Sequence, residues 1–204
     1  MTVIPDTAMP PTSLGERFEQ AWQFAARNHA GQPRKGTQVP YIAHLMSVAA
    51  LVLEAGGDEE LAIAGLLHDV VEDCGGKPML ERVRQNFGDR VAGIVDGCTD
   101  TYEHPKPEWT KRKQDYLEHL RSADADVRLV STADKLHNAR AILADYLNEG
   151  ETVWERFKGG REGTLWYYRA VTAELARTQV NALTPMLERT VRELDALMAN
   201  RGPE

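Results

Sequence analysis

Apolar residues along the chain recur mainly at three- and four-residue spacing, the period of one face of an α-helix. Glycine and proline residues divide this pattern into segments. We expect helices at about residues 13–31, 41–54, 58–75, 78–87, 89–96, 108–121, 124–148, 151–158, 161–180 and from 184 onward. Residues 127–132 would pass locally for a strand, but the helical spacing continues through them. The pattern predicts an all-α fold, a single compact domain of about eight to ten helices.

Two helix starts carry a specific capping signal. Ser13 followed by Glu16 forms a capping-box pattern, and Asp58 is a good N-cap residue before an acidic first turn. We therefore expect residues 1–12 to form a flexible N-terminus and residues 13–200 to form the domain. No internal repeat or linker divides it.

Composition narrows the class of protein. The chain has 204 residues, 42% hydrophobic and 27% charged, with a formal net charge of −7. This charge argues against nucleic acid as the main ligand. No apolar run reaches the roughly 18 residues that span a membrane, and no signal peptide pattern opens the chain. Cys74 and Cys98 form neither a disulfide framework nor a metal motif. A cytoplasmic protein with no membrane partner is expected, and its oligomeric state is not readable.

Ionisable residues cluster directly after the apolar run 61–67. The cluster consists of His68, Asp69, Glu72 and Asp73. Buried charges cost several kcal/mol unless they are paired or bound to a metal. His44 and Asp134 are two further polar residues in apolar helical surroundings. Together these positions predict one polar pocket built from three core helices.

The side chains of this pocket suit metal chemistry. Imidazole and carboxylate ligands together favour a divalent transition metal such as Mn, Fe or Zn. Such a metal lowers the pKa of its water and polarises a phosphoryl oxygen. The predicted ligands are His44, His68, Asp69 and Asp134. Glu72 and Asp73 are then free to orient or deprotonate an attacking water.

Basic residues outside this cluster are open to two interpretations. Arg112 and Lys113 either hold phosphates or belong to an exposed helix face. Arg161 follows two glycines at a predicted helix start near several aromatic residues, where it either meets an anion or only packs.

The residues around the predicted pocket resemble, in order, the motifs of one known family. The order of His44, then His68 and Asp69, then Asp134 resembles the signature of HD phosphohydrolases. The surrounding segments resemble the alarmone hydrolase domain of RelA/SpoT proteins and cover about residues 16–145. These segments are His29–Gly36, Pro40–Leu45, Leu66–Asp73, Phe87–Ala92, Val95–Thr99 and Ala133–Arg140.

The resemblance implies a fold, an activity and a set of roles. The fold is an HD domain, and that family uses Mn²⁺ to remove the 3′-pyrophosphate from ppGpp and pppGpp. The resemblance assigns the metal to the same four ligands and the water to Glu72 and Asp73. It also implies that Arg34 and Lys35 pack on guanine and that Asn138 hydrogen-bonds it. A chain of this length resembles a stand-alone small alarmone hydrolase.

Two departures from the family pattern concern the base. The loop before His44 is one residue longer than usual, and Ala141 stands where longer enzymes often have threonine. Three hypotheses therefore remain: a guanosine alarmone hydrolase, an HD phosphohydrolase of another nucleotide (an adenine alarmone or a nucleotide cofactor), and a non-catalytic nucleotide-binding module. Glu72 and Asp73 argue against the last, because a binding module has no need of a water-activating pair.

Overall fold

Helices make up the regular structure of the chain. The computed structural model describes residues 12–103, 105–178 and 181–200, so most of the predicted N-terminal segment, residues 1–11, lies outside it. The described residues form α1 Glu16–Asn28, α2 Ile42–Glu54, α3 Glu59–Leu67, α4 Val70–Cys74, α5 Gly76–Phe87, α6 Asp89–Cys98, α7 Trp109–Ser122, α8 Ala125–Glu149, the 3₁₀ helix η1 Gly150–Arg156, α9 Gly160–Arg177 and α10 Thr184–Asn200. Within these ranges the β-structure is limited to one isolated bridge between Pro33 and Pro40. The all-α prediction is confirmed.

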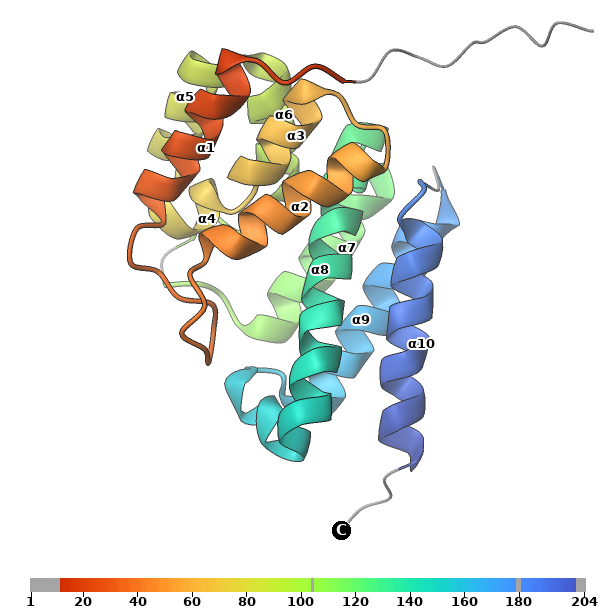
Figure 1. The fold of residues 1–204 in the computed structure, drawn as a ribbon. Coiled ribbons are helices and arrows are strands. Elements are labelled where there is room, and N and C mark those ends of the chain that lie inside the picture. Colours follow the sequence, from red (N-terminus) through yellow and green to blue (C-terminus); the bar gives the residue numbers. More distant parts are fainter. Residues whose placement is uncertain (1–11, 104, 179–180, 201–204) are drawn as a thin grey trace, which may run out of the picture.

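Helix α8 runs through the centre of the molecule (Figure 1). It packs against α2, α3 and α6 on one side and against α9, α10 and η1 on the other. Buried apolar residues from both groups of helices form one continuous core. Among the described helices, none is both long and apolar enough to cross a membrane.

A close approach of α2 and α3 brings two predicted ligands together. Every residue of α3 from Leu61 to Leu67 is buried. A Cβ added at Gly65 would lie 3.1 Å from the Cα of Ala49, so these small residues allow the two helices to touch. His44 lies at the start of α2 and His68 directly follows α3. The contact thus places both rings at one end of the helix pair.

The two capping predictions had different outcomes. The Asp58 carboxylate accepts a hydrogen bond from the Leu61 amide at 2.9 Å, which confirms it as the N-cap of α3. The capping box at Ser13 was wrong. The N-cap of α1 is Gly15, whose amide instead donates to Glu59 Oε1 at 2.6 Å. A long-range contact therefore replaces the local one.

The helix predicted over residues 58–75 is interrupted at His68 and Asp69. The His68 ring donates from Nδ1 to the Gly65 carbonyl oxygen at 2.8 Å. In a continuous helix, the Asp69 amide would bind that carbonyl. The side chain therefore competes with the backbone for the same acceptor and ends α3. The break, rather than an i, i+4 face, sets the directions of His68 and Asp69.

A buried arginine closes the ends of two helices. Arg128 of α8 is 1% exposed. Its guanidinium donates to the carbonyl oxygens of Leu120 at 2.7 Å, Glu174 at 2.7 Å, Leu175 at 3.1 Å and Thr178 at 2.8 Å. These acceptors lie at the C-terminal ends of α7 and α9, where a cation is favourable. Arg128 thereby fixes both helices against α8.

Replacing Arg128 with methionine should destabilise the fold strongly. The substitution keeps the apolar stem but leaves several buried carbonyls without a donor, which we expect to cost about 3–5 kcal/mol. Urea unfolding followed by circular dichroism measures the loss. Arg169→Met is the matched control, because the Arg169 side chain is 54% exposed and pairs with Asp195 at the surface. Equal stability losses in the two variants would contradict the assigned role.

Candidate active site

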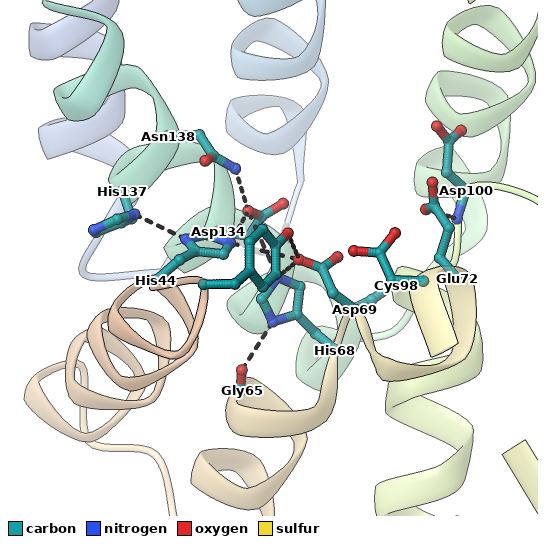
Figure 2. Close-up of polar contacts among 12 residues, drawn as sticks. His44, Gly65, His68, Asp69, Glu72, Cys98, Asp100, Asp134, His137 and Asn138 are labelled. Atoms are coloured by element: carbon teal, nitrogen blue, oxygen red, sulfur yellow. Dashed lines mark hydrogen bonds and ion pairs between the residues drawn. The ribbon is translucent and has the colours of Figure 1, made fainter. Parts of the chain in front are cut away.

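Three polar side chains from distant parts of the sequence meet inside the core (Figure 2). His44, His68 and Asp134 are buried, and one ligand atom from each lies within 4.8 Å of the others. Asp134 Oδ1 is 3.3 Å from His44 Nε2 and 3.7 Å from His68 Nε2. Helix α2, the residue that follows α3 and helix α8 thus supply one buried donor group, as the sequence predicted.

Asp69 completes the predicted set from the helix break. Its Oδ2 atom lies 3.1 Å from His68 Nε2 and 3.6 Å from His44 Nε2. The Tyr41 hydroxyl donates to the same oxygen at 2.5 Å. The structure therefore brings all four predicted ligands to one point.

Neighbouring groups orient the two imidazoles. Because the Gly65 carbonyl can only accept, His68 carries a proton on Nδ1 and turns Nε2 toward the other ligands. His44 Nδ1 lies 2.8 Å from His137 Nδ1. Burial, together with the charges of His44 and Arg34, lowers the pKa of His137 to about 4. A neutral His137 can accept from His44 Nδ1, and this leaves His44 Nε2 free as a ligand atom.

The residues present fit a metal ion. His68 Nε2 is buried and makes no well-aligned hydrogen bond among the described residues, although Asp69 Oδ2 lies 3.1 Å away, and such an atom is costly without a ligand. Burial disfavours a charged His68, but the carboxylates of Asp69 and Asp134 outweigh it and raise its pKa well above the usual value. Positive charge is therefore favoured at this point. A divalent cation would take the place of that proton, and the buried His/His/Asp group is consistent with one.

Lys135 and Asn138 hold Asp134 from the side. Lys135 Nζ lies 2.6 Å from Asp134 Oδ2, and the Asn138 amide donates to Oδ1 at 2.5 Å. Despite burial, Lys135 and the two histidine ligands keep the pKa of Asp134 well below its usual range. Asn138 also accepts from the Arg34 guanidinium at 2.9 Å. Asn138 thus links the buried ligands to the loop before α2.

The two predicted catalytic carboxylates have different surroundings. Glu72 lines the pocket beside the ligands, and its Oε2 lies 3.3 Å from the Asp100 amide (Figure 2). Its Oε1 lies 2.7 Å from Lys106 Nζ. Asp73 is exposed and is not among the lining residues. Its Oδ2 accepts from the Gln32 amide at 2.9 Å. Glu72 is therefore the one placed to reach a bound molecule.

Cations gather at one side of this pocket, which has a volume of about 440 Å³. Arg112 and Lys113 of α7 line it together with Lys106. Both α7 cations bind the Asp100 carboxylate, Lys113 at a distance of 2.9 Å. Arg112 is only 8% exposed, so the exposed-face interpretation was wrong for it. This side of the pocket suits phosphate groups.

The opposite end of the pocket combines cations with flat and apolar side chains. Lys35 Nζ lies 5.7 Å from the centre of the Phe157 ring, and Arg34 meets Asn138. Burial and the charge of Lys158 lower the pKa of Lys35. Ala141, Ile142 and Tyr168 line the same pocket. The planar guanidinium of Arg34, the Lys35 cation and aromatic rings suit a nucleobase.

Arg161 does not join the site. Its guanidinium donates to the Met198 carbonyl oxygen at 3.0 Å and lies 3.4 Å from Glu151. It is not among the lining residues and serves the packing of α9 on α10.

The sequence analysis did not predict Lys106 and Asp100 as site residues. Both lie in the segment 99–108, where a lysine between two prolines was the one available signal.

Comparisons with known proteins agree with this geometry. A family model described as an HD domain matches residues 21–165. The chain is 39% identical over 126 residues to guanosine-3′,5′-bis(diphosphate) 3′-pyrophosphohydrolase MESH1 of Xenopus tropicalis, covering 60% of this chain and 68% of that protein. It is 38% identical over 203 residues to a GTP pyrophosphokinase of Streptomyces coelicolor, covering 95% of this chain but 22% of that longer protein.

A solved structure shows the same likeness in three dimensions. The report of that structure states that "a metazoan ortholog of SpoT hydrolyzes ppGpp and plays a role in starvation responses". The two structures superpose with a TM-score of 0.75 at 30% sequence identity, covering 89% of this chain and 97% of that chain.

Proposed function

Because the chain belongs to the HD-domain phosphohydrolases related to the SpoT and MESH1 alarmone hydrolases, we propose that it removes the 3′-pyrophosphate from guanosine alarmones such as ppGpp. The observation that carries this proposal is the pocket itself. Asp69 and Asp134 of the metal-type group line it together with Glu72, with cations at one side and flat and apolar side chains at the other. The hydrolase activity named for MESH1 of Xenopus tropicalis supports the same substrate class.

The proposed metal ligands are His44, His68, Asp69 and Asp134, with Mn²⁺ as the proposed ion and Fe²⁺ or Zn²⁺ as possible replacements. When bound, such an ion supplies Lewis acidity and lowers the pKa of water. The protein's contribution is to fix both imidazoles through Nδ1, so that each Nε2 faces the site, and to hold Asp134 ionised through Lys135. This arrangement keeps the donor atoms ready for the ion.

Glu72 is the proposed general base. Its carboxylate is fixed by Lys106 and the Asp100 amide, and takes a proton from the attacking water. The water oxygen bonds to the 3′-linked phosphorus, the bond from that phosphorus to O3′ breaks, and O3′ takes up a proton from solvent, to which Glu72 returns its own. Asp73, held by Gln32 outside the pocket lining, is proposed to support this step. The products are GDP and pyrophosphate.

The substrate is proposed to lie across the pocket. Lys106, Arg112 and Lys113 compensate the phosphate charges. Arg34 and Lys35 pack on the base, and Asn138 lies at its edge. Arg161, which packs against α10, has no part in this arrangement.

Product analysis tests the proposed function. Purified protein with Mn²⁺ and ppGpp should yield GDP and pyrophosphate, separated by anion-exchange chromatography. Orthophosphate as the first product would contradict the proposed bond cleavage. Rapid turnover of an adenine alarmone or a nucleotide cofactor, with none of ppGpp, would instead support an HD phosphohydrolase of another nucleotide.

Arg34→Ala should raise KM more than it lowers kcat. Base packing is felt in the ground state and the transition state alike, so its loss weakens binding without slowing chemistry. Loss of one charged contact predicts a rise in KM of about 10–100-fold. Steady-state kinetics with ppGpp measure both constants, with Arg27→Ala on the exposed face of α1 as the control. A fall in kcat at constant KM would place Arg34 in the chemical step.

A further inference from the structure

A carboxylate on α8 lines the pocket but has no part in the proposed chemistry. Asp145 follows Asn138 by seven residues and Asp134 by eleven, so all three lie on one face of α8. Ala141, also in the lining, lies between Asn138 and Asp145. The helix rises by about 16 Å from Asp134 to Asp145. One face of α8 thus runs from the metal-type ligands to the end of the base site.

Asp145 is held in place on one side only. Arg156 Nη1 lies 3.0 Å from Asp145 Oδ2, while no residue in the described ranges donates a hydrogen bond to Oδ1. The Arg156 side chain also packs on Gly36, where an added Cβ would lie 2.3 Å from Arg156 Cδ. Arg156 therefore fixes both Asp145 and the loop that carries Arg34, and leaves one carboxylate oxygen available to a ligand.

The neighbours of Asp145 on α8 have little capacity left to distinguish bases. Both ends of the Asn138 amide are engaged, one by Arg34 and the other by Asp134. Ala141 and Ile142 offer no polar side-chain atom. Asp145 is a half-buried acceptor at the same end of the pocket. Asp145 is therefore a candidate, beside Asn138, for the hydrogen bonds that recognise the base.

The chemistry of a carboxylate favours one purine over the other. An ionised carboxylate only accepts hydrogen bonds. Guanine offers two donors side by side, N1–H and the N2 amino group, whereas adenine has an acceptor at N1. A fixed carboxylate therefore attracts the guanine edge and repels the adenine edge, and specificity of this kind uses both effects.

We propose that Asp145 selects guanine over adenine by accepting hydrogen bonds from N1–H and the N2 amino group. The proposal rests on the proposed function, in that the 3′-phosphate is taken to lie over the metal ligands. The base then lies on Ala141 and Ile142 with its donor edge toward Asp145. Arg156 positions the carboxylate and does not touch the base.

Nucleotide binding tests this role without relying on turnover. Isothermal titration of the wild-type protein should show tighter binding of GDP than of ADP, with inosine diphosphate, which lacks the N2 amino group, in between. Asp145→Asn should weaken GDP binding about 10–100-fold and leave ADP binding unchanged or stronger. Asp195→Asn is the matched control, because Asp195 also pairs with one arginine but lies on α10. It should bind both nucleotides as the wild type does.

A second variant separates base reading from structural support. Asp145→Glu keeps the charge and its pairing with Arg156 but moves the carboxylate, so the preference for GDP should still fall. Equal wild-type affinities for GDP and ADP, or a wild-type preference in both variants, would overturn the proposal. If ppGpp is not hydrolysed but the preference for GDP depends on Asp145, the proposed function fails and the base selection stands.

Discussion

Replacing His68 with alanine is expected to abolish metal binding and to reduce turnover by roughly 10³-fold or more. His68 Nε2 is buried, makes no well-aligned hydrogen bond among the described residues, and lies beside Asp69 and Asp134. Without this nitrogen the site keeps the charges of its carboxylates but loses a neutral ligand. Elemental analysis of protein purified without chelator, together with activity before and after EDTA treatment, measures the effect.

His119→Ala is the control for this experiment, because His119 is exposed on α7 and bonds to the Gly97 carbonyl oxygen outside the pocket. It should keep wild-type metal content. Asp134→Asn adds a nearly isosteric test, since it preserves the shape of the side chain and removes the ligand charge. A wild-type protein that carries no metal, and whose activity ignores EDTA, would refute the metal site.

Glu72→Gln should lower kcat by about 10²–10⁴-fold while metal content and KM stay close to the wild type. Glutamine keeps the shape and can still accept hydrogen bonds, but it cannot take a proton from water. The wild-type carboxylate is held by Lys106 at 2.7 Å, so the variant should also fold with this contact weakened rather than lost. Steady-state kinetics and metal analysis on the same preparation separate chemistry from binding.

Asp73→Asn tests how much each of the two carboxylates contributes to turnover. Asp73 was predicted to serve the water, but it is exposed, is held by Gln32 and is not among the residues that line the pocket. We expect a loss of turnover smaller than that of Glu72→Gln. The control is Glu193→Gln on α10, where Glu193 pairs with Arg189 at the surface. Turnover near the wild-type value in both Glu72→Gln and Asp73→Asn would require a different general base.

The sequence by itself determined the helices and the buried donor set. Helical periodicity is local, so the segments now seen as α2 and α8 were recognisable within a few turns. His44, His68 and Asp134 stood out because ionisable groups within apolar helices are costly unless they serve a purpose. These residues lie close together because the apolar faces of their helices pack into one core.

The tertiary structure decided what periodicity cannot encode. The break at His68 depends on a side chain competing for the Gly65 carbonyl, and local spacing gives no sign of that. Lys106 lies in a loop, where no period assigns a direction, and only its contact with Glu72 places it at the site. Arg112 and Arg161 looked alike in sequence, yet one lines the pocket and the other binds the end of α10. Charges on a helix are equally compatible with solvent, pocket or helix end, so the packing of distant helices alone assigns them.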